Sequence, residues 1–242
     1  MDDMVNQHLA VIIARGGSKR IPQKNIIDFM GKPLLAWTVE AALASSVFTR
    51  VLLSTDDEQI AQTGRQFGAE APFLRTENAD DQAPSSHATL SALNQAQAHF
   101  NESYDTVTQL MPNCPLRDAQ DIRRAFEQFQ QSHSNFQLSC FPFGWMNPWW
   151  AFTKSEARHE RYLFPEALKM RSQDLSPLYC PTGAIWMART DAFMQSQTFY
   201  GDPLTWFELD WKSAVDIDDY GDLEMAQAAY LIKRNTPIKS AP

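Results

Sequence analysis

A loop rich in glycine and cations follows the first apolar run of this 242-residue chain, and it reads A-R-G-G-S-K-R-I-P-Q-K-N over residues 14–25. Glycines let backbone amides approach an anion, and lysine and arginine neutralise its charge. Neither the Walker order nor the G-x-G-x-x-G order of a dinucleotide fold is present. We therefore predict a phosphate-binding loop of a different type, in preference to a solvated basic turn. The groups expected to meet phosphate are Arg15, Gly16, Gly17, Ser18, Lys19 and Lys24.

Two aspartates near the other end of the chain, Asp216 and Asp218, alternate with Val215 and Ile217. On an extended segment, this period of two places both carboxylates on one face. Paired carboxylates suit Mg²⁺, which binds through one or two carboxylates together with substrate phosphates. The alternative is that Asp218 only caps the following helix, the role that we expect of Asp219. We favour a magnesium site at Asp216 and Asp218.

Other candidates carry less weight. The segment S-T-D-D at residues 54–57 follows an apolar run and either contributes to a site or only caps the next helix. Arg75 either reaches a nucleotide or stays a surface charge. Gln173 and Asp174, just after Arg171, could bind a polar substrate. The five histidines form no spaced set, so we expect neither a catalytic triad nor a histidine metal site.

The charges are unevenly distributed. The chain has 21 Lys+Arg against 29 Asp+Glu, a formal net charge of −8, which argues against a nucleic-acid partner. Residues 15–32 hold five cations and one acid, whereas residues 202–224 hold eight acids and one cation. The two segments could meet at one site that needs both signs of charge.

Composition also bears on location. No apolar run approaches the roughly 18 residues of a membrane span, so no membrane contact is expected. The first residues, MDDMVNQH, are acidic and polar, unlike a secretory signal. Three cysteines, Cys114, Cys140 and Cys180, lack metal-ligand spacing and are typical of reduced thiols. We expect a cytoplasmic protein.

The elements that must position these groups alternate between strand and helix. This pattern predicts an α/β fold with a doubly wound, mostly parallel sheet, whose strand carboxyl ends form the ligand-binding edge. The expected strands cover residues 8–14, 50–54, 72–74, 105–111 and 183–188; the expected helices cover 33–44, 57–67, 86–100, 118–131 and 219–233.

An insertion interrupts the alternation. Residues 142–180 begin with proline and clustered aromatics, and we expect a hairpin-like arm there, with the α/β core formed by residues 1–141 and 181–242. Trp145, Trp149 and Trp150 fit ordinary packing, a subunit surface or a ligand wall. Because aromatics dominate interface energetics, clustered tryptophan on an arm suits subunit contact, and a homodimer is expected.

From residue 10 to about 231 the chain resembles the CMP-sialic acid synthetases, or acylneuraminate cytidylyltransferases. The family's A-R-x-G-S-K-x-x-x-x-K-N motif matches residues 14–25, and F-x-G-K-P-L matches 29–34. Its S-T-D-D-E-x-I-A element matches residues 54–61, and its D-I-D metal motif matches 216–218. The arginine and serine that contact the nucleotide in that family correspond to Arg75 and Ser86.

The resemblance implies a fold of the nucleotide-diphospho-sugar transferase type and a reaction. The anomeric hydroxyl of a nonulosonic acid attacks the α-phosphorus of CTP, and pyrophosphate leaves. Arg15 and Lys24 would hold the triphosphate, and Asp216 and Asp218 would hold Mg²⁺, so these four are the expected catalytic residues. The implied CTP-binding set is Ala14, Arg15, Gly16, Gly17, Ser18, Lys19, Lys24, Asn25, Arg75 and Ser86.

Departures from the family concern the sugar. Met111 stands where the family has a glutamine that contacts sialic acid, and Trp186 replaces a tyrosine. Apolar replacements favour a less hydroxylated sugar, because a hydroxyl against them would lose its hydrogen bonds. Residues 18–22 and 171–175 are similar to the branch that activates pseudaminic acid, so pseudaminic or legionaminic acid is the expected substrate. The implied sugar-binding set is Met111, Arg171 (for the carboxylate), Gln173, Trp186, Phe199 and Tyr200.

Three alternatives remain beside a pseudaminic or legionaminic acid enzyme. Two are a CMP-N-acetylneuraminate synthetase and a CMP-Kdo-type synthetase. The third is a non-catalytic nucleotide-binding homologue, against which the intact cations and aspartates argue.

Overall fold

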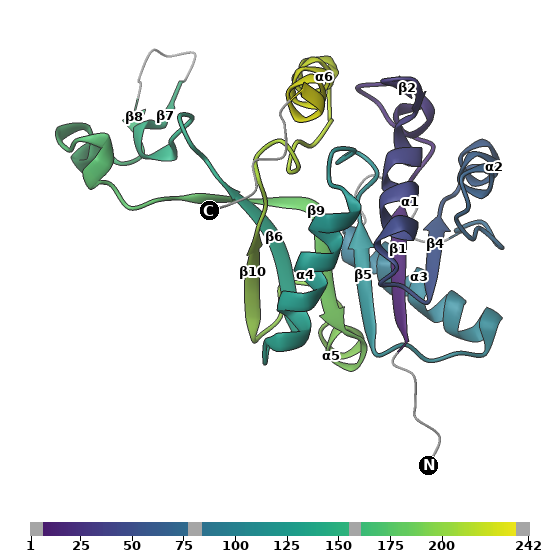
Figure 1. The fold of residues 1–242 in the computed structure, drawn as a ribbon. Helices are drawn as coiled ribbons and strands as arrows, with labels where there is room; N and C mark the ends of the chain where they lie inside the picture. Colours follow the sequence, from purple (N-terminus) through teal and green to yellow (C-terminus); the bar gives the residue numbers. More distant parts are fainter. Residues whose placement is uncertain (1–6, 77–83, 155–160, 236–242) are drawn as a thin grey trace.

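A six-stranded sheet forms the centre of the computed structural model, which describes residues 7–76, 84–154 and 161–235 (Figure 1). The strand order is β10-β6-β9-β5-β1-β4. β9 runs antiparallel to both of its neighbours, and the other pairs are parallel. The mostly parallel α/β sheet predicted from the sequence is therefore confirmed. The strands are β1 (His8–Ile13), β4 (Arg50–Ser54), β5 (Thr106–Leu110), β6 (Phe136–Pro142), β9 (Tyr179–Arg189) and β10 (Leu204–Glu208).

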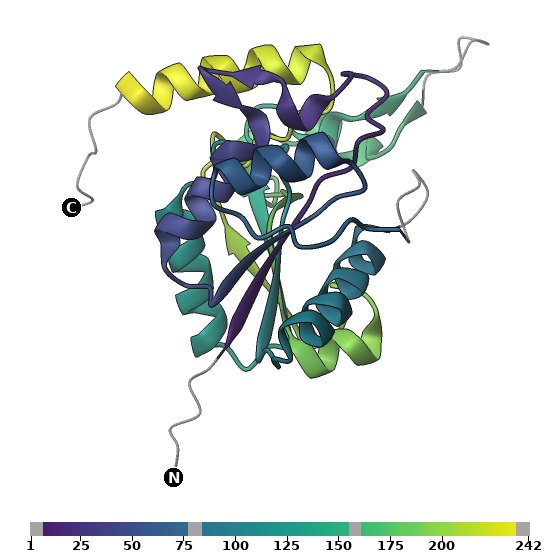
Figure 2. The ribbon, with the colours of Figure 1, turned by 90° about the vertical axis from the view of Figure 1, so that its right-hand side faces the viewer.

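Helices cover both faces of this sheet because the side chains of its strands alternate between two apolar cores. In β1, Ala10 and Ile12 pack toward one core and Leu9 and Val11 toward the other. Figure 2 shows α1 and α4 on one face and α3 and α5 on the other. The helices are α1 (Leu34–Ser45), α2 (Glu58–Gln66), α3 (Ser85–Phe100), α4 (Ala119–Gln131), α5 (Thr190–Ser196) and α6 (Tyr220–Asn235).

A third, smaller core lies above the carboxyl ends of the strands. There α6 packs through Ala226 and Ala229 against Ile21 and Phe29, which belong to the segment after β1. The same segment contains the short helix η1 (Lys24–Ile26) and an antiparallel pair, β2 (Asp28–Phe29) with β3 (Lys32–Pro33). This packing brings two distant segments, residues 14–25 and residues 213–218, to the same edge of the sheet (Figure 2). These are the predicted phosphate loop and the segment with the paired aspartates.

Some element predictions were wrong. Residues 72–74 form no strand: Glu70 makes one isolated bridge with Leu52, and the chain then continues irregularly through Pro72, which has no amide hydrogen for a ladder. The sequence patterns also missed β6, β10 and α5, and β9 is longer than expected.

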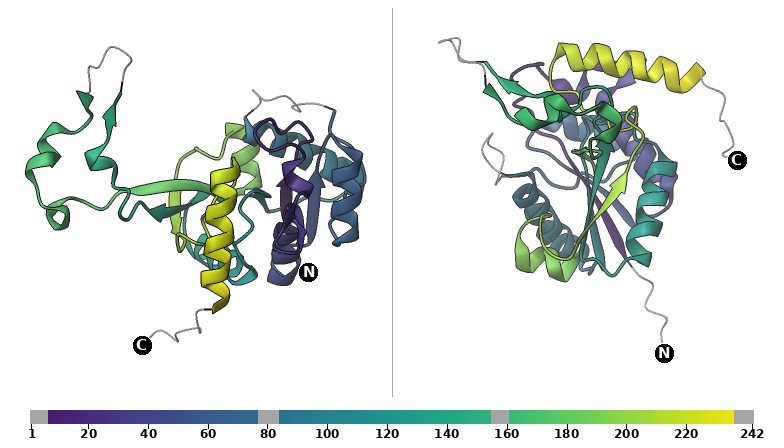
Figure 3. Two further views of the ribbon diagram at one scale, coloured as in Figure 1. Left: turned by 90° about the horizontal axis from the view of Figure 1, so that it is seen from above. Right: turned by 90° about the vertical axis from the view of Figure 1, so that its left-hand side faces the viewer.

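The insertion leaves the sheet between β6 and β9 and extends away from it (Figure 3). Its two short strands, β7 (Phe152–Thr153) and β8 (Arg161–Tyr162), pair antiparallel, as the expected hairpin requires. Three short helices accompany them: η2 (Pro148–Trp150), η3 (Pro165–Lys169) and η4 (Ser172–Asp174). Trp149 packs inside the arm against Phe164, whereas Trp145 is 86% exposed.

Among the helices that the structure describes, none has the length and apolar character needed to cross a membrane.

Candidate active site

The loop after β1 has a conformation that specific contacts hold. The Gly16 amide donates to Oδ1 of Asp56 at 2.9 Å, and buried Asn25 donates its amide to the Arg15 carbonyl at 2.9 Å. A Cβ added to Gly16 would lie 2.8 Å from Oδ2 of Asp57, so a larger residue at this position would have to displace that carboxylate. The loop is therefore a built structure, which favours the phosphate-loop interpretation over a solvated turn.

The S-T-D-D segment supports this loop from β4. Asp57 caps α2 by accepting from the amides of Gln59 and Ile60, at 2.7 and 3.1 Å. Asp56 is the residue that holds Gly16. The two alternatives for this segment therefore apply to different residues. Asp57 caps a helix, whereas Asp56 holds the backbone of the predicted phosphate loop.

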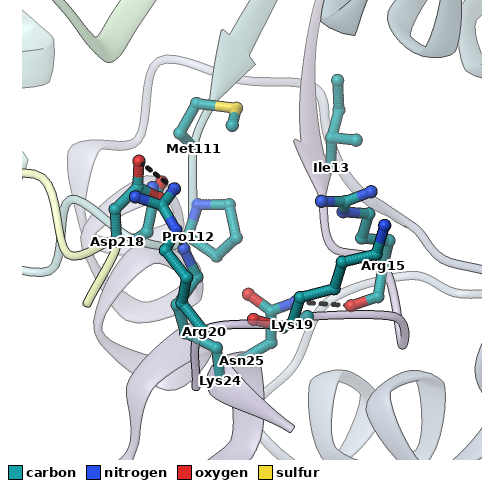
Figure 4. A pocket seen from close by; sticks show the side chains of 11 residues that line it. Ile13, Arg15, Lys19, Arg20, Lys24, Asn25, Met111, Pro112 and Asp218 are labelled. Carbon is teal, nitrogen blue, oxygen red and sulfur yellow. Dashed lines mark hydrogen bonds and ion pairs between the residues drawn. The ribbon is translucent and has the colours of Figure 1, made fainter. Parts of the chain in front are cut away.

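A cavity of about 410 Å³ opens between this loop and the segment after β5 (Figure 4). It lies at the carboxyl ends of β1 and β5, the edge predicted for ligands. Ala14, Gly16, Gly17 and Asp216 are not among its lining residues. The lining comprises Ile13, Arg15, Ser18, Lys19, Arg20, Lys24, Asn25, Met111, Pro112, Asn113 and Asp218.

The basic and acidic segments meet in this cavity. Lys24 Nζ lies 2.9 Å from Oδ1 of Asp218 and 2.7 Å from the Ile217 carbonyl oxygen. Arg20 contacts the other oxygen of Asp218 at 2.7 Å. The two oppositely charged stretches therefore meet in space, as the sequence suggested.

The two aspartates have opposite pKa shifts. Desolvation, and then the charge of Asp218, raises the pKa of Asp216 to about 6. Desolvation also acts to raise the pKa of Asp218, but hydrogen bonds and charge from Lys24 and Arg20 outweigh it and lower that pKa below its ordinary value. Asp218 is thus the more readily ionised member of the pair, although the Asp216 residue is exposed and ionises near neutral pH.

The donor set suits a hard cation. Within the described residues, no three His, Cys, Asp or Glu side chains gather as a metal-binding group. Asp216 and Asp218 would supply carboxylate oxygens, and no residue that the structure describes hydrogen-bonds the buried Oδ1 of Asn113 next to them. Mg²⁺ usually binds to one or two protein carboxylates and fills its other positions with water and substrate phosphate. A site with few protein oxygens beside an open cavity fits this preference.

Asn113 is a site residue that the sequence predictions missed. Its Nδ2 donates to Oδ1 of Asp216, and its carbonyl accepts from the Ile217 amide at 2.8 Å. Only its place directly after β5, at the ligand-binding edge, could have indicated it.

Arg75 and Ser86 are buried, at 4% and 5% exposure, and neither lines the cavity. The surface-charge alternative for Arg75 is therefore wrong. Its Nη1 is 3.5 Å from the Ser54 carbonyl oxygen, and its Nε has no hydrogen-bond partner among the described residues. Desolvation lowers the pKa of Arg75, and Arg15 adds to that effect. Because the charge of Arg15 acts on Arg75, Arg75 lies close to the phosphate loop.

The predicted sugar-binding residues fall into separate places. Met111 lines the cavity. Trp186 donates its indole N–H to the Thr182 carbonyl at 2.8 Å and packs against Phe199 and Tyr200. Phe199 is fully buried among core side chains, so its ring supports Trp186 and does not line the cavity. None of these three aromatic rings is a cavity-lining residue.

Arg171 and Gln173 lie on the arm, outside this cavity. Arg171 forms a two-pronged ion pair with Asp174, at 2.8 and 3.1 Å, and is exposed. The fold of one chain therefore does not bring these two residues together with Met111.

Fold and site together define a nucleotide-binding transferase of the α/β class, in which cations and carboxylates converge at the carboxyl ends of parallel strands. A cytidylyltransferase family model matches residues 9–219. The solved structure of CMP:2-keto-3-deoxy-manno-octonic acid synthetase complexed with CTP superposes with a TM-score of 0.68 at 18% identity, covering 94% of this chain and 100% of that one. That likeness concerns the fold alone.

Two curated relatives are closer in sequence. Pseudaminic acid cytidylyltransferase of Campylobacter jejuni (strain 81-176) is 38% identical over 95% of this chain and 99% of its own length. CMP-N,N'-diacetyllegionaminic acid synthase of Legionella pneumophila is 33% identical over 81% and 83%. The chain belongs to the cytidylyltransferase family, and it is a nucleotidyltransferase.

Proposed function

We propose that this enzyme transfers CMP from CTP to the anomeric hydroxyl of a nonulosonic acid, with pseudaminic acid as the first candidate and legionaminic acid as the second. The hydroxyl oxygen forms a bond to the α-phosphorus, the bond to the β-phosphate bridging oxygen breaks, and pyrophosphate leaves with that electron pair. The hydroxyl proton passes to solvent. The observation that carries the proposal is the contact of Lys24 with Asp218 inside a cavity lined by other cations.

The chain's own residues have a clear division of labour in this proposal. Arg15, Lys19 and Lys24 neutralise the triphosphate and the charge that develops on pyrophosphate. Asp216 and Asp218 would hold Mg²⁺, which when bound polarises the α-phosphate. Because little covalent chemistry is asked of the protein, positioning and electrostatics supply most of the rate.

Met111 supports the choice of sugar. Its side chain faces the cavity as an apolar group next to Gly183, where an added Cβ would lie 2.8 Å from the Met111 Cγ. A thioether offers no donor to a hydroxyl, so a deoxygenated nonulosonic acid is favoured over N-acetylneuraminic acid. The names of both curated relatives point in the same direction.

We also propose that the enzyme is a cytoplasmic homodimer joined through the arm. The arm exposes several large apolar side chains, and such patches mark interaction sites. A dimer would let Arg171 and Gln173, which do not reach their own chain's cavity, serve the partner's sugar site. Light scattering tests this directly, and a monomer would remove the interface role of the arm. The exposed apolar residues of the arm include Trp145, Met146, Trp150, Phe152, Tyr162, Leu163, Leu168 and Met170.

The decisive experiment measures pyrophosphate release from CTP and Mg²⁺ with a panel of sugar acids: pseudaminic, legionaminic, N-acetylneuraminic and Kdo. We expect release with pseudaminic or legionaminic acid, and a product that mass spectrometry identifies as the CMP-sugar. Absence of release with every nonulosonic acid would overturn the proposal. Preferential turnover of N-acetylneuraminic acid would overturn the choice of sugar alone, whereas preferential turnover of Kdo, an eight-carbon sugar acid, would overturn the nonulosonic acid class.

A further inference from the structure

We propose that Asn113 is a positioning residue for the divalent cation: its amide N–H fixes the carboxylate of Asp216, and its amide oxygen accepts a hydrogen bond from a water molecule of the hydrated cation. This inference rests on the proposed function, which places a divalent cation at Asp216 and Asp218.

Asn113 joins the segment after β5 to the segment that carries the aspartates. Its backbone carbonyl accepts from the Ile217 amide at 2.8 Å, and its side-chain amide donates to Asp216. One residue thereby holds both the backbone and the first carboxylate of the D-I-D segment, although Asn113 and Asp216 are 103 positions apart in the chain. Asn113 therefore restrains both the backbone of this segment and the Asp216 carboxylate.

The orientation of the amide follows from chemistry. An ionised carboxylate only accepts hydrogen bonds, so the NH₂ side of Asn113 must face Asp216. The oxygen side is then left without a partner: among the described residues, none hydrogen-bonds the buried Oδ1 of Asn113, and the whole residue is 6% exposed while it lines the cavity. Buried acceptors are seldom left unsatisfied, which indicates that a donor arrives with the ligand.

The donor is best identified by what lies next to Asn113. Its partner Asp216 stands beside Asp218, and Mg²⁺ bound to such a pair keeps several of its waters. These waters are strong hydrogen-bond donors, and neighbouring protein groups that accept from them set the geometry of the cation. A sugar hydroxyl is the competing donor, and the experiment separates the two.

Two substitutions of nearly equal size test whether hydrogen bonding by the side chain at position 113 is what matters. Asn113→Thr keeps one donor for Asp216 and acceptor lone pairs for water, whereas Asn113→Val has the same shape without either. Mn²⁺ binding is measured by electron paramagnetic resonance with protein and CTP but no sugar, against CTP alone as baseline. We expect Asn113→Thr to bind Mn²⁺ within about 3-fold of the unmodified enzyme, and Asn113→Val to bind it about 10- to 100-fold more weakly.

Thr182→Val is the matched control. Its hydroxyl donates to the Ala214 carbonyl at 3.1 Å, so the substitution removes a buried hydrogen bond to the same loop without touching Asp216. It should lower thermal stability and leave Mn²⁺ affinity unchanged. If Asn113→Val does not fold, Asn113→Ser and Asn113→Ala repeat the comparison with smaller side chains.

Equal Mn²⁺ affinity of Asn113→Val and Asn113→Thr would overturn the inference, and so would an effect confined to the KM of the sugar. An unmodified enzyme whose CTP complex binds Mn²⁺ no better than CTP alone would overturn it too. Failure of the proposed function appears differently, as absence of pyrophosphate release by the unmodified enzyme with any sugar acid.

Discussion

Lys24 and Asp218 are 194 positions apart in the chain, yet Nζ of Lys24 lies 2.9 Å from Oδ1 of Asp218. The ammonium group is mostly buried, with the Lys24 side chain 14% exposed, and it also binds the Ile217 carbonyl. One cation therefore links the phosphate loop to the carboxylates proposed to hold the metal. The net charge of −8 conceals this local arrangement, which is what would attract anionic substrates to an acidic protein.

Replacing Lys24 should damage catalysis more than folding. Lys24→Met removes the charge proposed to face the triphosphate and a hydrogen-bond partner that lowers the pKa of Asp218, so we expect kcat/KM for CTP to fall by about 10²- to 10³-fold. Lys32→Met is the control, because Lys32 pairs with Glu40 and stacks over Trp37, outside the cavity. Pyrophosphate release measures both, and an equal loss in the two variants would contradict the role of Lys24.

Asp218 and its neighbour Asp219 should behave oppositely. Asp218→Ala should abolish measurable pyrophosphate release, because Asp218 is a proposed metal ligand. Asp219 instead caps α6 by accepting from the Asp222 amide at 3.0 Å, as expected from the sequence. Asp219→Ala should therefore lower the free energy of unfolding by about 0.5–2 kcal/mol and retain activity. Urea denaturation and pyrophosphate assays check the pair; undiminished activity of Asp218→Ala would sink the metal assignment.

The elements around the phosphate loop could be predicted from the sequence because their signals are local. An apolar run, a glycine-rich loop and a helical period all lie within residues 8–45, and no distant partner is needed to recognise them. The same holds for α4, whose N-cap Asp118 and apolar face stand in one stretch. Parallel strands then place the loops at one edge by topology alone.

Elements stabilised by distant partners were missed. In β6, Gln137 and Ser139 are fully buried polar residues, which breaks the apolar pattern of a central strand. Gln137 is satisfied by the Ala125 carbonyl at 2.7 Å, and Ser139 by the Thr182 carbonyl at 2.9 Å. Asn113 was missed for the same reason, since its meaning depends on Asp216 packing beside it. Conversely, residues 72–74 have strand-like composition but lack a partner to pair with.

Gly16 and Gly17 offer a test of the loop's construction. Gly16→Ala would bring a methyl group 2.8 Å from Oδ2 of Asp57, whereas a Cβ at Gly17 has no neighbour within 4 Å. We expect Gly16→Ala to cost about 1–3 kcal/mol of stability through displacement of the loop, and Gly17→Ala to cost little. Differential scanning calorimetry compares the two without substrates, and equal melting temperatures would show that the loop is not held as described.

The pKa of Asp216, raised to about 6, makes a prediction about stability and pH in the absence of metal. Its ordinary value is 3.8, so between these values the folded protein binds the proton more tightly than the unfolded chain does. Ionisation of Asp216 therefore disfavours the folded state, and this penalty is absent below about pH 4, grows as the pH rises, and is complete above about pH 6. Asp216→Asn removes it.

We expect Asp216→Asn to melt about 1–3 °C above the unmodified protein at pH 8 and at the same temperature at pH 4. Asp210→Asn provides a control of opposite sign. Desolvation acts to raise the pKa of Asp210, but hydrogen bonds and charge from Lys212 outweigh it and lower that pKa, so its ionised form favours folding. Asp210→Asn should therefore melt below the unmodified protein at pH 8, with the difference shrinking as the pH falls below the ordinary value. Thermal unfolding across this pH range, with EDTA present, checks both; a destabilised Asp216→Asn at pH 8 would contradict the proposed origin of the shift.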